Sequence, residues 1–262
     1  MQTETPGIEE SFREIAPLIS PALSQIARSQ SAECVERQFN ALFQKFTWNK
    51  CANCGEEWSN INGKCPDCLK MENKAKGNEV RLRSMLGNYQ YERMTLESFN
   101  TAKPSSQRLK EIATAWRPDA KGLYLFGIVR SGKSHIASAL VREWYSAVKG
   151  HVAYWKTRSL MRVAGGMRGW EQENFISDVA SKTILVLDDV GIEKTSDHSL
   201  GILYDILEIR IYKGLKGLII TTNFTVEALA DKFGDMRLSS RLTELCEVIE
   251  VTQSFHDPFD GA

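Results

Sequence analysis

A loop that ends in a lysine and a serine is the first chemical signal in this sequence. Residues 127–134 are Gly-Ile-Val-Arg-Ser-Gly-Lys-Ser, which match the pattern Gly-x4-Gly-Lys-Ser/Thr. Backbone N–H groups of such a loop, and of the helix that follows it, bind phosphate. We expect Lys133 to reach the β- and γ-phosphates and the Ser134 hydroxyl to ligate Mg²⁺. The residues predicted to contact the nucleotide are Gly127, Arg130, Ser131, Gly132, Lys133, Ser134 and His135.

The loop departs from its common form at one position. Many loops of this kind have a third glycine where this chain has Arg130. Glycine accepts a positive φ without steric cost, whereas other residues do not. Arg130 must therefore tolerate that backbone geometry, or the loop takes a different path.

Two adjacent carboxylates follow a second apolar run. The sequence Thr-Ile-Leu-Val-Leu at 183–187 leads into Asp188 and Asp189. In an open parallel sheet, ligands bind beyond the carboxyl ends of the strands. We expect Asp188 to hold Mg²⁺ through water and Asp189 to orient and deprotonate an attacking water. Helix capping is the simpler alternative, but the loop at Lys133 favours an ATPase.

Two more polar residues extend this candidate site. The apolar run 217–222 ends at Asn223, whose amide can hydrogen-bond an attacking water or the γ-phosphate. Phosphoryl transfer also needs positive charge beyond that of one lysine, and a neighbouring subunit's arginine can supply it. Arg241 is the candidate for that role, and Arg237 is a weaker second choice that could serve only a structural salt bridge.

Four of the six cysteines have the spacing of a metal site. Cys51, Cys54, Cys65 and Cys68 form the pattern C-x2-C-x10-C-x2-C. Two facing turns of this kind bring four sulfurs into a tetrahedron, which suits structural Zn²⁺. The alternatives are two disulfides, which a cytosolic protein disfavours, and a redox-active pair, which is weaker still. Cys34 and Cys246 are isolated and are expected to be small buried or half-buried residues.

These residues imply the elements that must position them. Apolar runs at 123–126, 152–155, 183–187 and 217–222 predict strands of a parallel sheet, a final strand is predicted near 247–251, and a helical pattern follows the loop from Ile136. Residues 8–48 are predicted to be mostly helical, with an amphipathic helix over 31–46. We predict three parts: an N-terminal helical and zinc-knuckle domain at 1–69, a linker at 70–95, and an ATPase domain at 96–262.

A basic strip offers a site for nucleic acid. Residues 149–168 contain five basic side chains and no acidic ones, with aromatic residues among them. Basic groups bind phosphates and aromatic rings stack on bases. The DNA-binding candidates are Lys156, Arg162 and Arg168. A solvated helix face is an equally good explanation of this strip, and Trp155 is predicted to belong to the core.

Composition limits the possible classes. The chain has 262 residues, with 33 Lys and Arg against 33 Asp and Glu, so its net charge is zero. This balance excludes a basic coat over the whole surface. We find no apolar run long enough to span a membrane and no signal peptide, and therefore predict a cytoplasmic protein with no membrane partner.

Taken in order, the four motifs GIVRSGKS, ILVLDDVG, IITTN and RLSSRL resemble the AAA+ ATPases of the DnaC/DnaI helicase-loader type. ATPases of the IstB type look similar. The resemblance covers about 91–251 and implies that Lys133 and Ser134 belong to Walker A, Asp188 and Asp189 to Walker B, Asn223 to sensor 1, and Arg241 to an arginine finger. It also implies an α/β P-loop domain with a parallel sheet. Because eleven residues follow Val251, a C-terminal helical lid is not expected.

The resemblance also implies a function. Its members carry an N-terminal domain that binds the replicative hexameric helicase, and an ATPase domain that assembles side by side and contacts single-stranded DNA. We therefore predict an ATP-dependent helicase loader that uses ATP, Mg²⁺ and Zn²⁺. The alternatives are an IstB-type transposase-helper ATPase, a small-molecule kinase, and a zinc-finger DNA-binding module whose ATP site has decayed.

Overall fold

A computed structural model of the chain describes residues 48–51, 53–55, 57–59, 65–192 and 196–252. The helix predicted over 31–46 and the isolated Cys34 lie outside the described residues. The chain forms two compact units, one ending at Lys76 and the other beginning at Gly77. The predicted domain limits at 69 and 95 stay predictions.

The first unit contains a short hairpin and the cysteines. Strands β1 (Trp48–Lys50) and β2 (Glu57–Ser59) pair antiparallel. Cys51 and Cys54 lie in the turn after β1, where Gly55 takes a φ of 75°. Cys65 directly precedes helix α4 (Pro66–Leu86), and Cys68 lies in its first turn.

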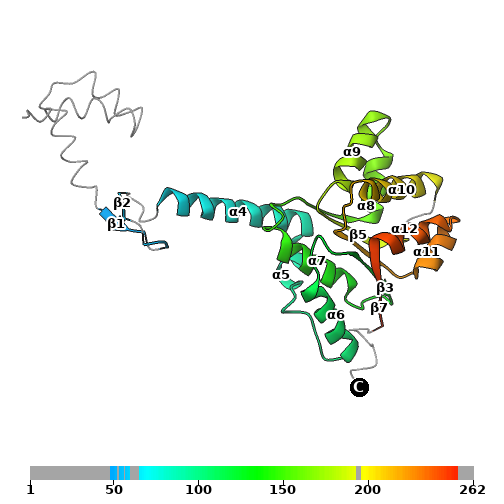
Figure 1. Cartoon of the computed structure of the whole chain (residues 1–262), viewed down its shortest axis with the longest axis horizontal. Coiled ribbons are helices and arrows are strands. Elements are labelled where there is room, and N and C mark those ends of the chain that lie inside the picture. Colours follow the sequence, from blue (N-terminus) through cyan, green and yellow to red (C-terminus); the bar gives the residue numbers. More distant parts are fainter. Residues whose placement is uncertain (1–47, 52, 56, 60–64, 193–195, 253–262) are drawn as a thin grey trace, which may run out of the picture. The chain divides into compact units, whose positions relative to one another are not determined.

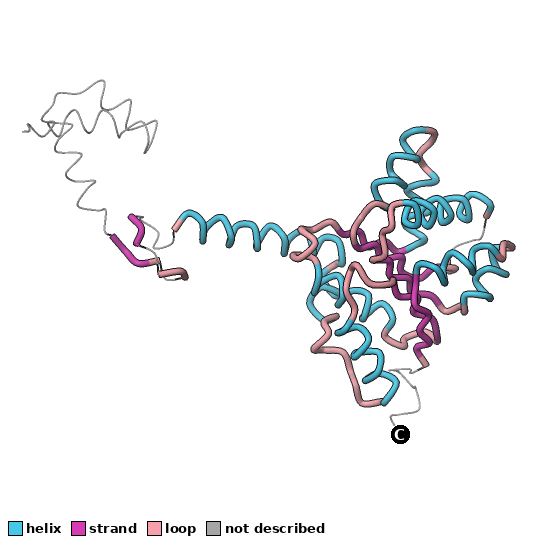
Figure 2. The backbone as a smooth tube through the Cα atoms, in the orientation of Figure 1, coloured by secondary structure: helices cyan, strands magenta, loops and turns pink. Residues whose placement is uncertain are grey.

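The second unit is built on a parallel sheet of five strands, in the order β4-β5-β6-β3-β7. These strands are the magenta segments at the centre of that unit in Figure 2. Because parallel strands cannot be joined by a tight turn, a helix or long loop must connect each strand to the next. The fold predicted from the sequence, a P-loop domain with a parallel sheet, is confirmed. The strands are β3 (Gly122–Gly127), β4 (Val152–Lys156), β5 (Ile184–Val190), β6 (Leu218–Thr222) and β7 (Cys246–Val251).

Helices cover both faces of this sheet (Figure 1). One face packs on α6, α7 and the C-terminal half of α4, and the other packs on α8 to α12. The short helix α5 packs on α7. The helices after α4 are α5 (Asn88–Arg93), α6 (Pro104–Ala115), α7 (Lys133–Trp144), α8 (Thr157–Gly165), α9 (Trp170–Ala180), α10 (Asp197–Tyr212), α11 (Val226–Phe233) and α12 (Arg237–Leu245).

Strand β5 shows why its sequence is apolar throughout. Successive side chains of a strand point to opposite faces, and both faces of this sheet are covered. Ile184 and Val186 therefore enter the core beneath α7, whereas Leu185 and Leu187 enter the core beneath α8 to α12. Asp188 and Asp189 lie near the carboxyl end of this strand, so a largely buried element carries the acidic pair.

Candidate functional site

The loop between β3 and α7 has the backbone geometry that its glycines and Arg130 require. Gly132 has a φ of 92°, and a Cβ at Gly127 would lie only 2.2 Å from the carbonyl oxygen of Val251. Arg130 has a φ of 62°, so it occupies the left-handed region that a glycine usually fills. The expectation that Arg130 tolerates this geometry is met.

The Lys133 side chain folds over this loop. Its ammonium donates hydrogen bonds to the carbonyls of Gly127 (2.9 Å) and Ile128 (2.6 Å) and to the buried Ser131 hydroxyl (3.2 Å). Burial lowers the pKa of Lys133, although Asp189 and Asp188 oppose that change by their charge. The loop thus gathers a cation and backbone N–H groups, a donor set that fits phosphate.

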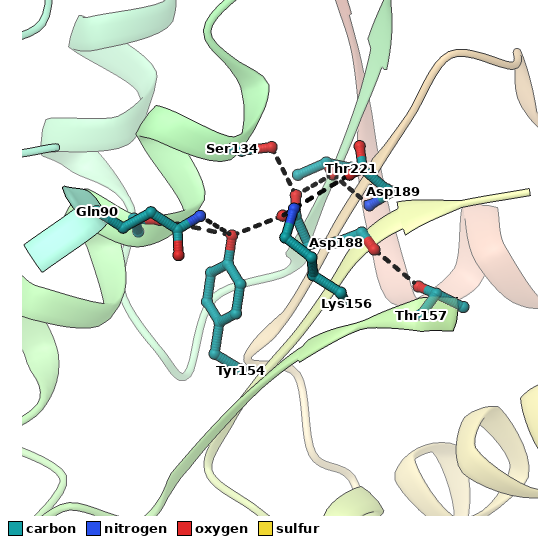
Figure 3. Close-up of polar contacts among 9 residues, drawn as sticks. Gln90, Ser134, Tyr154, Lys156, Thr157, Asp188, Asp189 and Thr221 are labelled. Carbon is teal, nitrogen blue, oxygen red and sulfur yellow. Dashed lines mark hydrogen bonds and ion pairs between the residues drawn. The ribbon is translucent and has the colours of Figure 1, made fainter. Parts of the chain in front are cut away.

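Asp188 is the best-connected side chain of the site (Figure 3). It is fully buried, with 0% of its surface exposed. Its Oδ1 accepts hydrogen bonds from Ser134 Oγ at 2.7 Å and from Thr221 Oγ1 at 2.6 Å. Its Oδ2 accepts one from the Tyr154 hydroxyl at 2.8 Å. A hydroxyl and a carboxylate in contact are oxygen ligands of the kind that Mg²⁺ prefers, so Ser134 and Asp188 fit that ion.

Asp189 is held differently from its neighbour. It has a φ of 62°, and the pairing of β5 with β6 shifts register between Leu187 and Val190. The bulge turns the Asp189 side chain outward, where 40% of it is exposed. Its N–H donates to Thr221 Oγ1 at 2.9 Å, which fixes the unusual backbone. Left-handed geometry at a residue other than glycine is strained and often lies at functional sites.

Lys156, at the end of β4, lies beside the two carboxylates. Its Nζ is 3.5 Å from Asp188 Oδ2 and 3.4 Å from Asp189 Oδ2, while 58% of its side chain is exposed. Partial burial alone would lower the pKa of Lys156, but attraction to the two carboxylates outweighs it and raises that pKa. The residue assigned to DNA by the sequence therefore also belongs to the acidic site.

Sequence reasoning missed two hydroxyl groups of this site. Thr221 lies within the motif that drew attention to Asn223, yet it is the threonine that contacts Asp188 and Asp189. Asn223 follows the end of β6 and is exposed. Tyr154 could be found only from the register of β4 with β5, because as a sequence signal it is one aromatic in an apolar strand.

His135, the second residue after Lys133, faces the segment before α6. Its Nε2 lies 2.8 Å from the carbonyl oxygen of Thr95 and 3.3 Å from Ser98 Oγ, and its ring meets Phe99 edge-on. Burial lowers its pKa. Its contacts tie the start of α7 to that segment.

The two candidate arginines lie on α12. Arg241 forms an ion pair with Glu208 of α10, and its guanidinium lies 5.6 Å from the centre of the Tyr204 ring. Arg237 forms an ion pair with Asp235 at 2.6 Å and stacks on the same ring at 5.9 Å. Both arginines thus have partners within their own chain.

The other two DNA-binding candidates lie on the surface. Arg162 is exposed on α8, and Arg168 is exposed between α8 and α9 next to the exposed Trp170. Trp155 is half-buried and meets Phe175 edge-on at 5.7 Å, so it packs against the core as predicted.

The four clustered cysteines come together as their spacing predicts. Their sulfurs all lie within 4.8 Å of one another. Cys54 Sγ and Cys65 Sγ are 3.7 Å apart, close to the ~3.8 Å expected between ligands of a tetrahedral zinc with bonds of about 2.3 Å. Backbone hydrogen bonds, that from Cys65 first, lower the pKa of Cys51 to about 6, whereas side-chain hydrogen bonds, that with Cys65 first, raise the pKa of Cys68 to about 12. This donor set fits Zn²⁺.

With this geometry in place, comparison with known proteins identifies the family. The family model of the IstB-like ATP binding proteins matches residues 67–256, most of the chain. The chain belongs to this family. It is also 33% identical over 136 residues to a Mycobacterium tuberculosis protein that is named as ATP-binding and placed in an insertion sequence. That match covers 49% of the IstB-like chain and 53% of the relative, so the chain spans about half the relative's length.

Solved structures agree with the fold. A crystal structure of the DnaC helicase loader is 26% identical, with a TM-score of 0.51, and the match covers 60% of the IstB-like chain and 96% of that chain. The replication initiator DnaA, bound to AMPPCP and single-stranded DNA, is 20% identical with a TM-score of 0.52, over 62% of this chain and 51% of that chain. This second likeness shows the AAA+ fold alone. Membership of the family supports ATP binding. Within the part of the chain that the structure describes, we find no helix long and apolar enough to cross a membrane.

Proposed function

We propose that this protein is an Mg²⁺-dependent ATPase that loads a replicative hexameric helicase onto single-stranded DNA. The observation that carries the proposal is the likeness to the DnaC helicase loader, which extends over nearly all of that loader's chain. The cysteine cluster ahead of the ATPase domain agrees with it, because it can order a separate module for a partner.

In this proposal the chain's own groups divide the work of hydrolysis. The loop N–H groups and the Lys133 ammonium bind the phosphates, and Ser134 with Asp188 hold Mg²⁺. Bound Mg²⁺ would neutralise charge on the phosphate oxygens. Asp189, exposed at the bulge, orients and deprotonates the attacking water, and Asn223, just after the neighbouring strand β6, is proposed to assist it.

Turnover by the purified protein tests the enzymatic part. Lys133→Ala should abolish ATP hydrolysis, because the substitution removes the loop's phosphate-binding cation. Lys216→Ala is the matched control, since Lys216 is exposed just before β6, at the opposite end of the strands. Turnover that survives Lys133→Ala would overturn the assignment of the site.

Arg241 is proposed to complete the site of a neighbouring subunit when ATP drives side-by-side association. The proposal requires the guanidinium to leave Glu208 and Tyr204 of its own chain. Arg237, held by Asp235, is the matched arginine on the same helix.

Single-stranded DNA is proposed to bind along α8 and the loop after it. Arg162→Ala and Arg168→Ala should each weaken binding to an oligonucleotide and reduce its salt dependence by about 0.7 in log–log slope. Arg108→Ala, at an exposed position of α6, is the control. Binding and a salt slope equal to wild type in both variants would remove DNA from this surface.

A second function, assistance to a transposase, is favoured by one observation, the relative placed in an insertion sequence. Purification of the tagged full chain from host cells separates the two functions. Recovery of the hexameric helicase, lost in Cys65→Ser but kept in Cys246→Ala, would support the loader. Recovery of a transposase would support the second function, and recovery of neither would overturn both.

A further inference from the structure

The hydroxyl of Tyr154 has a complete and directional set of partners. It donates to Asp188 Oδ2 at 2.8 Å and accepts from Gln90 Nε2 at 3.4 Å and from Ser138 Oγ at 3.5 Å (Figure 3). A phenol offers one donor and two acceptor sites, so these three contacts use all of them. Because the Gln90 amide nitrogen can only donate, the phenol proton is left for Asp188.

This arrangement fixes the orientation of the Asp188 carboxylate. Ser134 and Thr221 bind Oδ1, and Tyr154 binds Oδ2, so donors on both oxygens hold the plane of the group. Burial, and then the charge of Asp188, raise the pKa of Tyr154 far above its usual range.

Gln90 reaches this network from an element outside the strand, loop and helix of the nucleotide site. It lies in α5, next to Tyr91, whose ring stacks on Arg142 of α7 at 4.6 Å and on Arg83 of α4 at 4.7 Å. Arg142 also donates to the Tyr91 carbonyl. These contacts hold helix α5 against α7, the helix that carries both Ser134 and Ser138.

We propose that Tyr154 is a positioning residue for the metal-binding carboxylate of Asp188, and that Gln90 acts through the Tyr154 hydroxyl, so that the placement of α5 sets the site's affinity for the Mg²⁺ complex of the nucleotide. This inference rests on the proposed ATPase function. It adds two residues that lie outside the phosphate loop and the acidic pair, and a route by which the segment after α4 affects the site.

Tyr154→Phe is the direct test, because it removes the hydroxyl and keeps the buried ring. We would measure binding of a fluorescent, non-hydrolysable ATP analogue with Mg²⁺ and with EDTA. The variant should lose roughly tenfold of the strengthening that Mg²⁺ gives, the effect of one hydrogen bond to a charged group, and bind as wild type in EDTA. The apparent Mg²⁺ requirement of turnover should rise in parallel.

Tyr124→Phe is the matched control. Tyr124 is also a buried tyrosine of this sheet, in β3, but its hydroxyl donates to the carbonyl of Phe224 at 3.0 Å. The Tyr124→Phe protein should keep the wild-type effect of Mg²⁺ on nucleotide binding even if its melting temperature is lower. A Tyr154→Phe protein that responds to Mg²⁺ as wild type does would overturn the inference.

The role of Gln90 is tested by a double-mutant cycle. Gln90→Ala should reduce the Mg²⁺ effect about two- to threefold in the wild-type protein and have no further effect in Tyr154→Phe, because its partner hydroxyl is then gone. Gln107→Ala, which removes an exposed contact to Glu111 in α6, is the control and should change nothing. Equal effects of Gln90→Ala in both backgrounds would separate Gln90 from Tyr154. If wild type itself shows no Mg²⁺-dependent nucleotide binding, the proposed function fails, and not merely this inference.

Discussion

The cysteine cluster and the Asp188 site both gather ligand atoms for a cation, but they differ in what surrounds those atoms. Among the described residues of the first unit, the buried apolar cluster consists of Cys51, Cys65 and Cys68. Asp188 instead lies near the carboxyl end of strand β5, which runs between two large cores. We therefore expect the first site to depend on a bound metal for its order, whereas the packing of the two cores around its strand orders the second.

Removal of the ligand should therefore have opposite consequences at the two sites. Loss of zinc should unfold its module, because structural zinc contributes about 10–16 kcal/mol to small domains. Loss of nucleotide should leave Asp188 on its three hydroxyl donors.

The largest expected effect comes from breaking the cluster. Cys65→Ser should reduce bound zinc from one ion per chain to near zero and expose the first unit to protease, while the ATPase domain keeps its melting temperature. Metal analysis and limited proteolysis measure both effects. Cys246→Ala, outside the cluster, should keep one zinc, and full zinc content in Cys65→Ser would refute the four-sulfur site.

The next effect tests whether the Asp188 site is preorganised. Asp188→Ala should lower turnover by at least 10³-fold, because it removes the carboxylate that is proposed to hold Mg²⁺. It should also cost about 1–3 kcal/mol of stability, since Ser134, Thr221 and Tyr154 lose their acceptor.

Steady-state turnover and denaturant unfolding measure these two losses. Asp178→Ala, which removes only a surface ion pair with Lys182, is the control and should behave as wild type. A fully folded Asp188→Ala protein with normal turnover would remove the carboxylate from the site.

Arg241→Ala tests the proposal that the site of one chain depends on an arginine of its neighbour. Turnover should fall about 10³-fold, the low end for an arginine supplied by a neighbour, while ATP binding persists. Arg237→Ala should have a much smaller effect. Mixing Arg241→Ala with excess Lys133→Ala protein should restore some turnover, and failure to do so would place Arg241 in a structural role with Glu208.

The smallest effect concerns the loop backbone. Arg130→Gly should relieve about 1 kcal/mol of left-handed strain but restore freedom to the unfolded chain, for a net gain of about 0.5 kcal/mol. A melting temperature raised by roughly 1–2 °C would agree with this. A fall of several degrees would mean that the Arg130 side chain itself stabilises the loop.

The sequence predicted the fold and the residues Lys133, Ser134 and Asp188 because local patterns define them. A loop motif, an apolar run and the meeting of strand ends at one edge suffice to bring them together. The structure added contacts that depend on which strands are neighbours. Lys156 was assigned by its charge to a DNA strip, yet the register of β4 with β5 pairs it with Asp188. Thr221 and Tyr154 were missed because the sequence of one strand does not reveal which strands are its neighbours in the sheet.

The side-chain partners of Arg241 could not be predicted for a similar reason. Glu208 lies on α10, and only the packing of α12 against α10 reveals the pair. The cysteine cluster could be predicted without any knowledge of helix packing, because all four cysteines lie within 18 residues of one another along the chain.

Lys156 has a consequence for how the protein matures. Two adjacent carboxylates repel one another, and a cation between them offsets that repulsion during folding. Since Lys156 supplies the cation from the chain itself, a newly synthesised ATPase domain can fold before it meets any divalent ion. The cysteine cluster, by contrast, gathers four sulfurs within 4.8 Å of one another, and we expect it to need the metal in order to fold. Under zinc starvation, we therefore expect chains whose nucleotide-binding domain is folded and whose cysteine region is not.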